Sequence, residues 1–127
     1  MSSSSSGITF EGRDVVASVE RLSPAELDQL PFGVIKLDAS GKVSLFSRTE
    51  ARLSGFGDRP AIGKHFFTDL APCMGSPEFL SRVEQAHAQR TLDVLFEHVG
   101  DFEDRARVLR VRIKAATDGG TWLFLQR

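Results

Sequence analysis

The sequence predicts one α+β domain in which helices lie on one face of a five-stranded antiparallel sheet. Its 127 residues suit a single domain with a single core. Two strand-like segments around a glycine turn occur early, and three more strand-like segments end the chain. Helical patterns precede both groups of strands, and an antiparallel sheet with helices gathered on one side is the simplest packing of this order.

Two short helices are expected before the first strand. The serine run at residues 2–6 has nothing to bury, so residues 1–7 are expected to form a disordered leader. Apolar residues recur at helical spacing over residues 14–22. A second helix should begin at Pro24, because Ser23 can cap it and Glu26 stands where a capping-box carboxylate belongs.

A β-hairpin and a third short helix should follow. Apolar and polar residues alternate over residues 33–38 and 42–46, and Ala39, Ser40 and Gly41 form the turn between them. Residues 48–54 are rich in helix formers and are followed by Gly55, a residue that often ends a helix. Prolines and glycines interrupt residues 57–73, which predicts loops and single helical turns.

The last third predicts a long helix and three strands. The helix should run over residues 76–90, with Ser76, Pro77 and Glu78 at its capped start. Strands should follow at 92–99, 109–114 and 121–125, with a turn at 117–120. The final strand is an apolar run typical of a core-packed strand.

One strand has a basic face, formed by Arg110, Arg112 and Lys114, with Arg105 and Arg107 nearby. This face is read either as polar decoration of an exposed sheet or as a docking surface for an acidic partner.

Composition argues against several classes of function. Lysine and arginine number 16 against 17 acids, so no global field favours nucleic acid or an anionic membrane as partner. One cysteine cannot form an internal disulfide, and neither a signal segment nor a membrane-spanning apolar run is present. A cytoplasmic protein is therefore expected. The chain contains ten phenylalanines and no tyrosine, which is an unusual composition.

Metal binding and catalysis have little support in the sequence. His65, His87 and His98 lack metal-ligand spacing, both among themselves and with Cys73. Cys73 with His65 or His98 could be a nucleophile with its base, but nothing identifies an orienting third group or an oxyanion hole. The protein is therefore not expected to be an enzyme.

Cys73 is open to two interpretations from its own surroundings. A lone cysteine in a cytosolic protein is most often an inert buried side chain. However, Cys73 follows Pro72 and shortly precedes the start of the long helix, where free amides could stabilise a thiolate for acylation.

Three segments carry a family resemblance. Residues 31–38 (PFGVIKLD), 62–73 (IGKHFFTDLAPC) and 76–79 (SPEF) resemble the photoactive yellow protein family of PAS-domain blue-light receptors. The resemblance implies a PAS core at residues 31–127 and an N-terminal helical cap at residues 8–30. It also implies p-coumaric acid (4-hydroxycinnamic acid) bound to Cys73 as a thioester.

Glu50 matches the buried glutamic acid of that family, although most glutamates are solvated. If it faces a pocket formed by Phe46, Phe66, Phe67 and Phe96, desolvation should raise its pKa and keep it protonated. The resemblance then implies that light isomerises the chromophore and that a proton passes from Glu50 to the phenolate. The unpaired carboxylate left in the interior would loosen the packing around it.

Several positions depart from the family pattern. Phe46 replaces a tyrosine that donates to the phenolate, and Phe56 replaces an arginine that shields the pocket. His98 and Phe102 replace two further tyrosines, and Asp104 a methionine. Ser54 matches a supporting hydroxyl and could partly substitute as donor, and we expect a mixture of protonated and ionised chromophore at neutral pH. The residues expected at the site are Cys73, Glu50, Phe46, Ser54, Phe56, Pro72, Phe66, Phe96 and Phe102.

A second function stays open. The chain could be a PAS interaction module whose Cys73 carries nothing and which regulates a partner by dimerising or docking. In either case the resemblance implies an unidentified downstream signalling protein. PAS domains often pair through their sheets or N-terminal helices, so a homodimer is a further expectation.

Overall fold

A single antiparallel sheet organises the structure. The computed structural model describes residues 8–57, 60–71, 76–89, 91–100 and 104–127. All neighbouring strands pair antiparallel in the order β2-β1-β5-β4-β3, which confirms the predicted five-stranded sheet. The strands are β1 (Gly33–Leu37), β2 (Val43–Phe46), β3 (Asp93–Val99), β4 (Val108–Ala115) and β5 (Thr121–Gln126).

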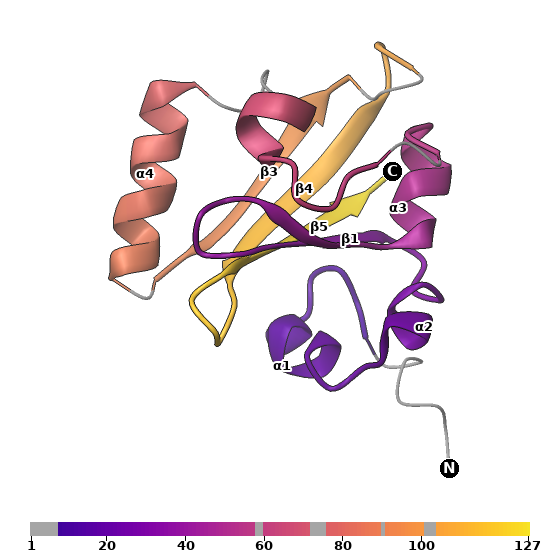
Figure 1. Ribbon diagram of the computed structural model, residues 1–127, viewed down its shortest axis with the longest axis horizontal. Coiled ribbons are helices and arrows are strands. Elements are labelled where there is room, and N and C mark those ends of the chain that lie inside the picture. Colours follow the sequence, from indigo (N-terminus) through magenta and orange to yellow (C-terminus); the bar gives the residue numbers. More distant parts are fainter. Residues whose placement is uncertain (1–7, 58–59, 72–75, 90, 101–103) are drawn as a thin grey trace.

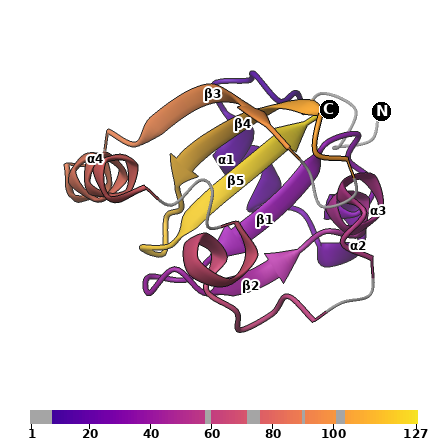
Figure 2. The ribbon, with the colours of Figure 1, turned by 90° about the horizontal axis from the view of Figure 1, so that it is seen from above.

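Helices cover both faces of this sheet. Figure 1 shows the short helices α1 (Val15–Val19) and α2 (Pro24–Leu27) below the sheet, and α3 (Arg48–Ser54) and α4 (Pro77–Ala88) above it. Seen from above in Figure 2, α4 lies beside the edge strand β3. A π-helical turn, η2 (Phe66–Leu70), lies on the same face as α3 and α4. The predicted N-terminal helices therefore form a separate layer, opposite α3, η2 and α4.

Two hydrophobic cores result, one on each face of the sheet. The first lies between the N-terminal layer and the sheet and contains Phe10, Phe32, Val34, Trp122 and Phe124, among others. The second, larger core packs η2, α4 and Phe56, which follows α3, against the opposite face. Strand β5 serves both, since Trp122 and Phe124 belong to the first core and Leu123 and Leu125 to the second. This explains its continuous apolar sequence and confirms the predicted core-packed strand.

Local signals set the helix ends. The capping box of Ser23 and Glu26 is present at the start of α2, and Ser76 caps α4 as predicted. Gly55 ends α3 with a φ of 81°, a left-handed conformation that glycine adopts without steric cost. Helix α1 is shorter than the predicted range of residues 14–22.

The structure corrects both interpretations of the basic face of β4, as exposed polar decoration and as a docking surface. Arg112 is only 7% exposed, and its guanidinium donates to the carbonyl oxygens of Phe10 and Gly12. It also bonds the carboxylate of Asp93 on β3. The face is neither open decoration nor a free docking surface, because the segment before α1 covers its centre and binds to it.

Candidate functional site

Glu50 is placed by the way α3 starts. The hydroxyl oxygen of Ser47 accepts from the backbone nitrogens of Glu50 and of Val34 on β1, each at 3.1 Å, which joins the start of α3 to the sheet. Glu50 is 1% exposed. The structure therefore supports the buried position expected for Glu50 and excludes the solvated alternative.

A glycine makes room for the Glu50 carboxyl. A Cβ atom added at Gly33, the first residue of β1, would lie 1.8 Å from Oε1 of Glu50 and 2.9 Å from its Cδ. Real Cβ atoms essentially never approach other atoms so closely. The absence of a side chain at Gly33 is thus a condition for the observed position of Glu50.

Arg127 is the residue that the sequence did not predict. Its two terminal nitrogens donate to the two carboxylate oxygens of Glu50, with Nη1 2.7 Å from Oε1 and Nη2 2.9 Å from Oε2. Its side chain is only 8% exposed. Arg127 directly follows β5, where Leu125 pairs with Gly33, so sheet register brings it next to Glu50. The expectation of a neutral Glu50 did not include this cation.

Ser54 offers a buried hydroxyl near the end of the same helix. It is fully buried, and its Oγ accepts from the backbone nitrogen of Phe56 at 3.1 Å. Within the described residues no acceptor is found for its hydroxyl hydrogen. Ser54 can therefore donate a hydrogen bond to a polar group that enters this region.

One pair of aromatic rings lies beside α3, and a second pair belongs to η2. The rings of Phe46 and Phe56 lie 5.2 Å apart, and Phe56 is only 6% exposed. Phe66 and Phe67 on η2 form an edge-to-face pair at 5.0 Å. All four belong to or pack against the larger core, so the structure brings together the aromatic residues that were expected there.

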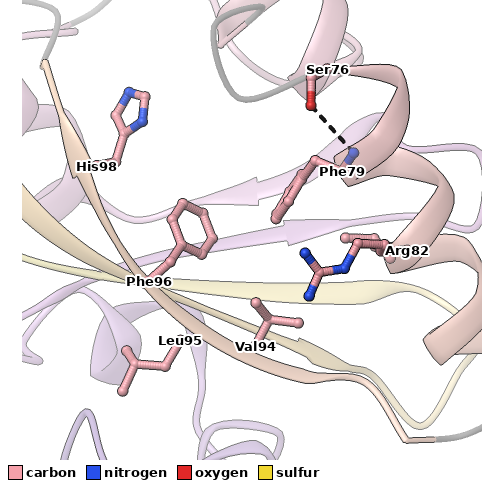
Figure 3. Close-up of a pocket in the computed structure, with 8 residues that line it drawn as sticks. Ser76, Phe79, Arg82, Val94, Leu95, Phe96 and His98 are labelled. Carbon is pink, nitrogen blue, oxygen red and sulfur yellow. Dashed lines mark hydrogen bonds between the residues drawn. The ribbon is translucent and has the colours of Figure 1, made fainter.

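Phe96 joins this group through Phe79 of α4. The two rings are 5.3 Å apart, and Phe79 in turn lies 6.4 Å from Phe67. Both rings line a cavity of about 410 Å³, together with Arg82 and His98. Figure 3 shows the rings of Phe96 and Phe79 next to each other. Glu50 and Phe46 are not among the described residues that line it. Phe96 is thus part of the aromatic group, and the cavity that it lines does not include Glu50.

Three expected site residues lie outside the described part of the chain. They are Cys73, Pro72 and Phe102. Their roles stay predictions. Asp104 is exposed, and its side chain accepts from the backbone nitrogen of Ala106 at 3.0 Å.

The described residues show no group of three or more histidine, cysteine or acidic side chains that could hold a metal ion. Among the helices of the described segments, none has both the length and the apolar character needed to cross a membrane.

Comparison with known proteins shows which proteins this chain resembles. The sequence pattern of the PAS fold matches residues 23–127. Photoactive yellow protein of Halochromatium salexigens is 37% identical over 121 residues, covering 94% of this chain and 97% of that protein. The protein of the same name from Rhodothalassium salexigens is 33% identical over 121 residues, covering 94% and 97%.

The chain belongs to the photoactive yellow protein family of PAS domains.

A solved structure agrees with this assignment. The photoactive yellow protein domain of the sensor histidine kinase Ppr from Rhodospirillum centenum matches with a TM-score of 0.77 at 35% identity, covering 87% of this chain and 98% of that one. The predicted fold and family are therefore confirmed. The paired rings of Phe46 and Phe56 make the region beside α3 apolar in this member of the family.

Proposed function

We propose that this chain is a blue-light photoreceptor that carries p-coumaric acid as a thioester on Cys73. The observation that supports it most is the buried carboxyl of Glu50 on α3, in a chain of the photoactive yellow protein family. The described residues fit a planar aromatic group with one polar end. Phenylalanine rings supply apolar walls, and Glu50 and Ser54 supply polar contacts.

When bound, the chromophore supplies light absorption and isomerisation about its double bond. The chain holds and senses it. Phe46, Phe56 and Phe66 pack around the site and exclude water, and the Ser54 hydroxyl donates to the phenolic oxygen. Glu50 exchanges a proton with that oxygen, and the resulting change of charge in a buried position loosens the surrounding packing. The family resemblance implies that Glu50 donates this proton. The Glu50 carboxyl must then be protonated before illumination.

The proposed output is a change of shape, without conversion of a substrate. The Rhodospirillum centenum match is a domain of a sensor histidine kinase. By analogy, we propose that this chain acts on a signalling partner in the cytoplasm, with no direct role for nucleic acid or membrane. Pairing of two copies remains part of this proposal.

Expression with activated p-coumaric acid tests the proposal. Intact mass should show one acyl adduct, and the absorption spectrum a new band of the bound chromophore. Cys73→Ala should lose both while keeping the circular dichroism of a folded protein. A folded wild-type protein that stays at its unmodified mass would contradict the proposal and leave the chromophore-free interaction module.

A further inference from the structure

Arg127 and Glu50 form a buried contact that was not predicted from the sequence. Both terminal nitrogens of the guanidinium face both oxygens of the carboxylate, at 2.7 and 2.9 Å. Both side chains are buried, at 8% and 1% exposure. A bidentate, charge-assisted contact of this kind is among the stronger hydrogen-bonding arrangements in proteins.

This geometry favours an ionised Glu50. Arginine stays charged in proteins and can only donate, so both oxygens of Glu50 must act as acceptors toward it. A proton on either oxygen would remove one acceptor and would leave a buried guanidinium without its counterion. Leaving one partner of a buried pair uncompensated is strongly unfavourable.

In the described segments, other charged side chains near α3 contact partners other than the Glu50 carboxyl. Among the described residues, Nη1 of Arg107 donates to the carbonyl oxygen of Leu53 at 2.6 Å. At the start of α3, Arg48 and Asp28 form a pair at 3.8 Å in which the Arg48 side chain is 91% exposed. On β1, the backbone of Gly33 lies against the carboxyl.

We propose that Arg127 is a positioning residue that holds Glu50 as a carboxylate, so that resting Glu50 accepts a hydrogen bond from a phenolic O–H instead of donating one to a phenolate. The inference rests on the function proposed above. It reverses the role of Glu50 before illumination.

The two possible positions of the proton, on Glu50 or on the phenolic oxygen, can be compared directly. With Arg127 charged, an ionised Glu50 beside a phenol and a neutral Glu50 beside a phenolate carry the same net charge. Only the oxygen that holds the proton differs. Arg127 stabilises the charge on Glu50 through two charge-assisted hydrogen bonds. A charge on the phenolic oxygen would have the neutral hydroxyl of Ser54 as its donor, because Phe46 and Phe56 offer neither a hydroxyl nor a cation. The proton therefore rests on the phenolic oxygen.

The first test uses the chromophore-free protein, so that it does not depend on attachment to Cys73. Carbon NMR of protein labelled at the glutamate carboxyl, with Glu50→Gln to assign the signal, follows the protonation of Glu50 against pH. We expect an ionised Glu50 at neutral pH. Arg127→Gln should raise the titration midpoint by more than about one pH unit, a tenfold change in the protonation equilibrium.

Two further variants separate the ion pair from general effects. Arg127→Lys keeps the charge and should restore most of the wild-type midpoint. Arg48→Gln removes one exposed positive charge from the same helix and should leave the midpoint unchanged. A protonated Glu50 in the wild-type protein at neutral pH, or equal midpoints with and without Arg127, overturns the inference.

The second test uses the reconstituted protein, with the adduct on Cys73 verified by mass for each variant. At neutral pH, Arg127→Gln should show more of the ionised chromophore band than the wild type, and Arg127→Lys should resemble the wild type. Equal spectra for all three, with adduct present, would refute the role of Arg127. Absence of the adduct would refute the proposed function, and the NMR titration would still decide on Arg127.

Discussion

At the scale of single residues, the site depends on one absent side chain as much as on those present. Glu50 can lie against β1 only because Gly33 has no Cβ, whose calculated position is 1.8 Å from Oε1 of Glu50. Ala differs from Gly by this one methyl group. The position is therefore a sensitive test of how closely Glu50 is packed.

Gly33→Ala should displace the Glu50 carboxyl and weaken its contact with Arg127. We expect a loss of about 1–3 kcal/mol in the free energy of unfolding, as for other cases of overpacking. Urea denaturation of wild type and variant measures it. In a Glu50→Ala background the cost should be smaller, since the atoms at 1.8 and 2.9 Å are gone. An equal cost in both backgrounds would show that Glu50 is not the obstacle.

The sequence was sufficient to predict Glu50 but not Arg127. The short helix after the hairpin was predicted from local residues, and the family resemblance pointed to a buried glutamate on it. Arg127 lies 77 positions further along the chain, and no local pattern marks it as buried or paired. Only the register of β5 against β1 brings the two side chains together. Such pairs depend on tertiary structure and leave no periodic signal.

At the scale of elements, Arg112 fixes the segment before α1 to the sheet. It donates to the carbonyl oxygens of Phe10 and Gly12 at 3.0 and 2.8 Å, from a side chain that is 8% exposed. Arg110, on the same strand and the same face, pairs with Glu11 at 3.0 Å, but the two side chains are 36% and 60% exposed. The two arginines therefore form a matched comparison.

Arg112→Gln should cost about 2–4 kcal/mol in unfolding free energy, because it leaves buried carbonyl oxygens and Asp93 with weaker partners. Arg110→Gln should cost less than about 1 kcal/mol, as is usual for exposed pairs. Hydrogen exchange should rise at residues 8–14 in the first variant only. Similar effects of both substitutions would argue against the anchoring role of Arg112.

Helix and strand signals were more reliable than the reading of surfaces. Ser23, Ser76 and Gly55 act where the sequence placed them, because caps depend on neighbouring residues. The basic face of β4 was misread, because the segment that covers it lies about a hundred positions away. Alternation along a strand indicates two different faces. It does not indicate what covers each face.

At the scale of the whole molecule, stability should fall in acid. Burial alone would raise the pKa of Glu20, but hydrogen bonds from the Trp122 ring nitrogen and from Thr117 outweigh it and hold this pKa below its ordinary value of 4.5. Asp93 likewise has a lowered pKa, because Arg112 and Lys114 overcome the effect of burial. Both carboxylates connect separate parts of the fold.

A lowered pKa in the folded state stabilises the protein above the pKa of the unfolded chain, and this contribution is lost as the pH falls through the folded-state value. The free energy of unfolding should thus be steady near neutral pH and decrease below about pH 4.5. Urea titrations across this range measure it, and Glu20→Gln should show a shallower decrease. A stability that rises on acidification would reverse the assigned sign.

The two cores should unfold together, because β5 contributes side chains to both. Phe124 is fully buried, lies edge-to-face with Phe32 at 6.0 Å and stacks on Trp122 at 6.1 Å. Phe124→Ala should cost about 3–5 kcal/mol. Leu95→Ala, at a side chain that is 50% exposed, should stay within about 0.5 kcal/mol and serves as control.

Two probes of the same urea transition test this coupling. Fluorescence of Trp122, the single tryptophan, reports on the core beneath the N-terminal helices, and far-ultraviolet circular dichroism reports on all helices and strands. We expect coincident transitions in the wild type and in both variants, since loss of packing on one face of β5 withdraws support from the other. A fluorescence transition that precedes the loss of secondary structure would instead show that the N-terminal layer detaches as an independent unit.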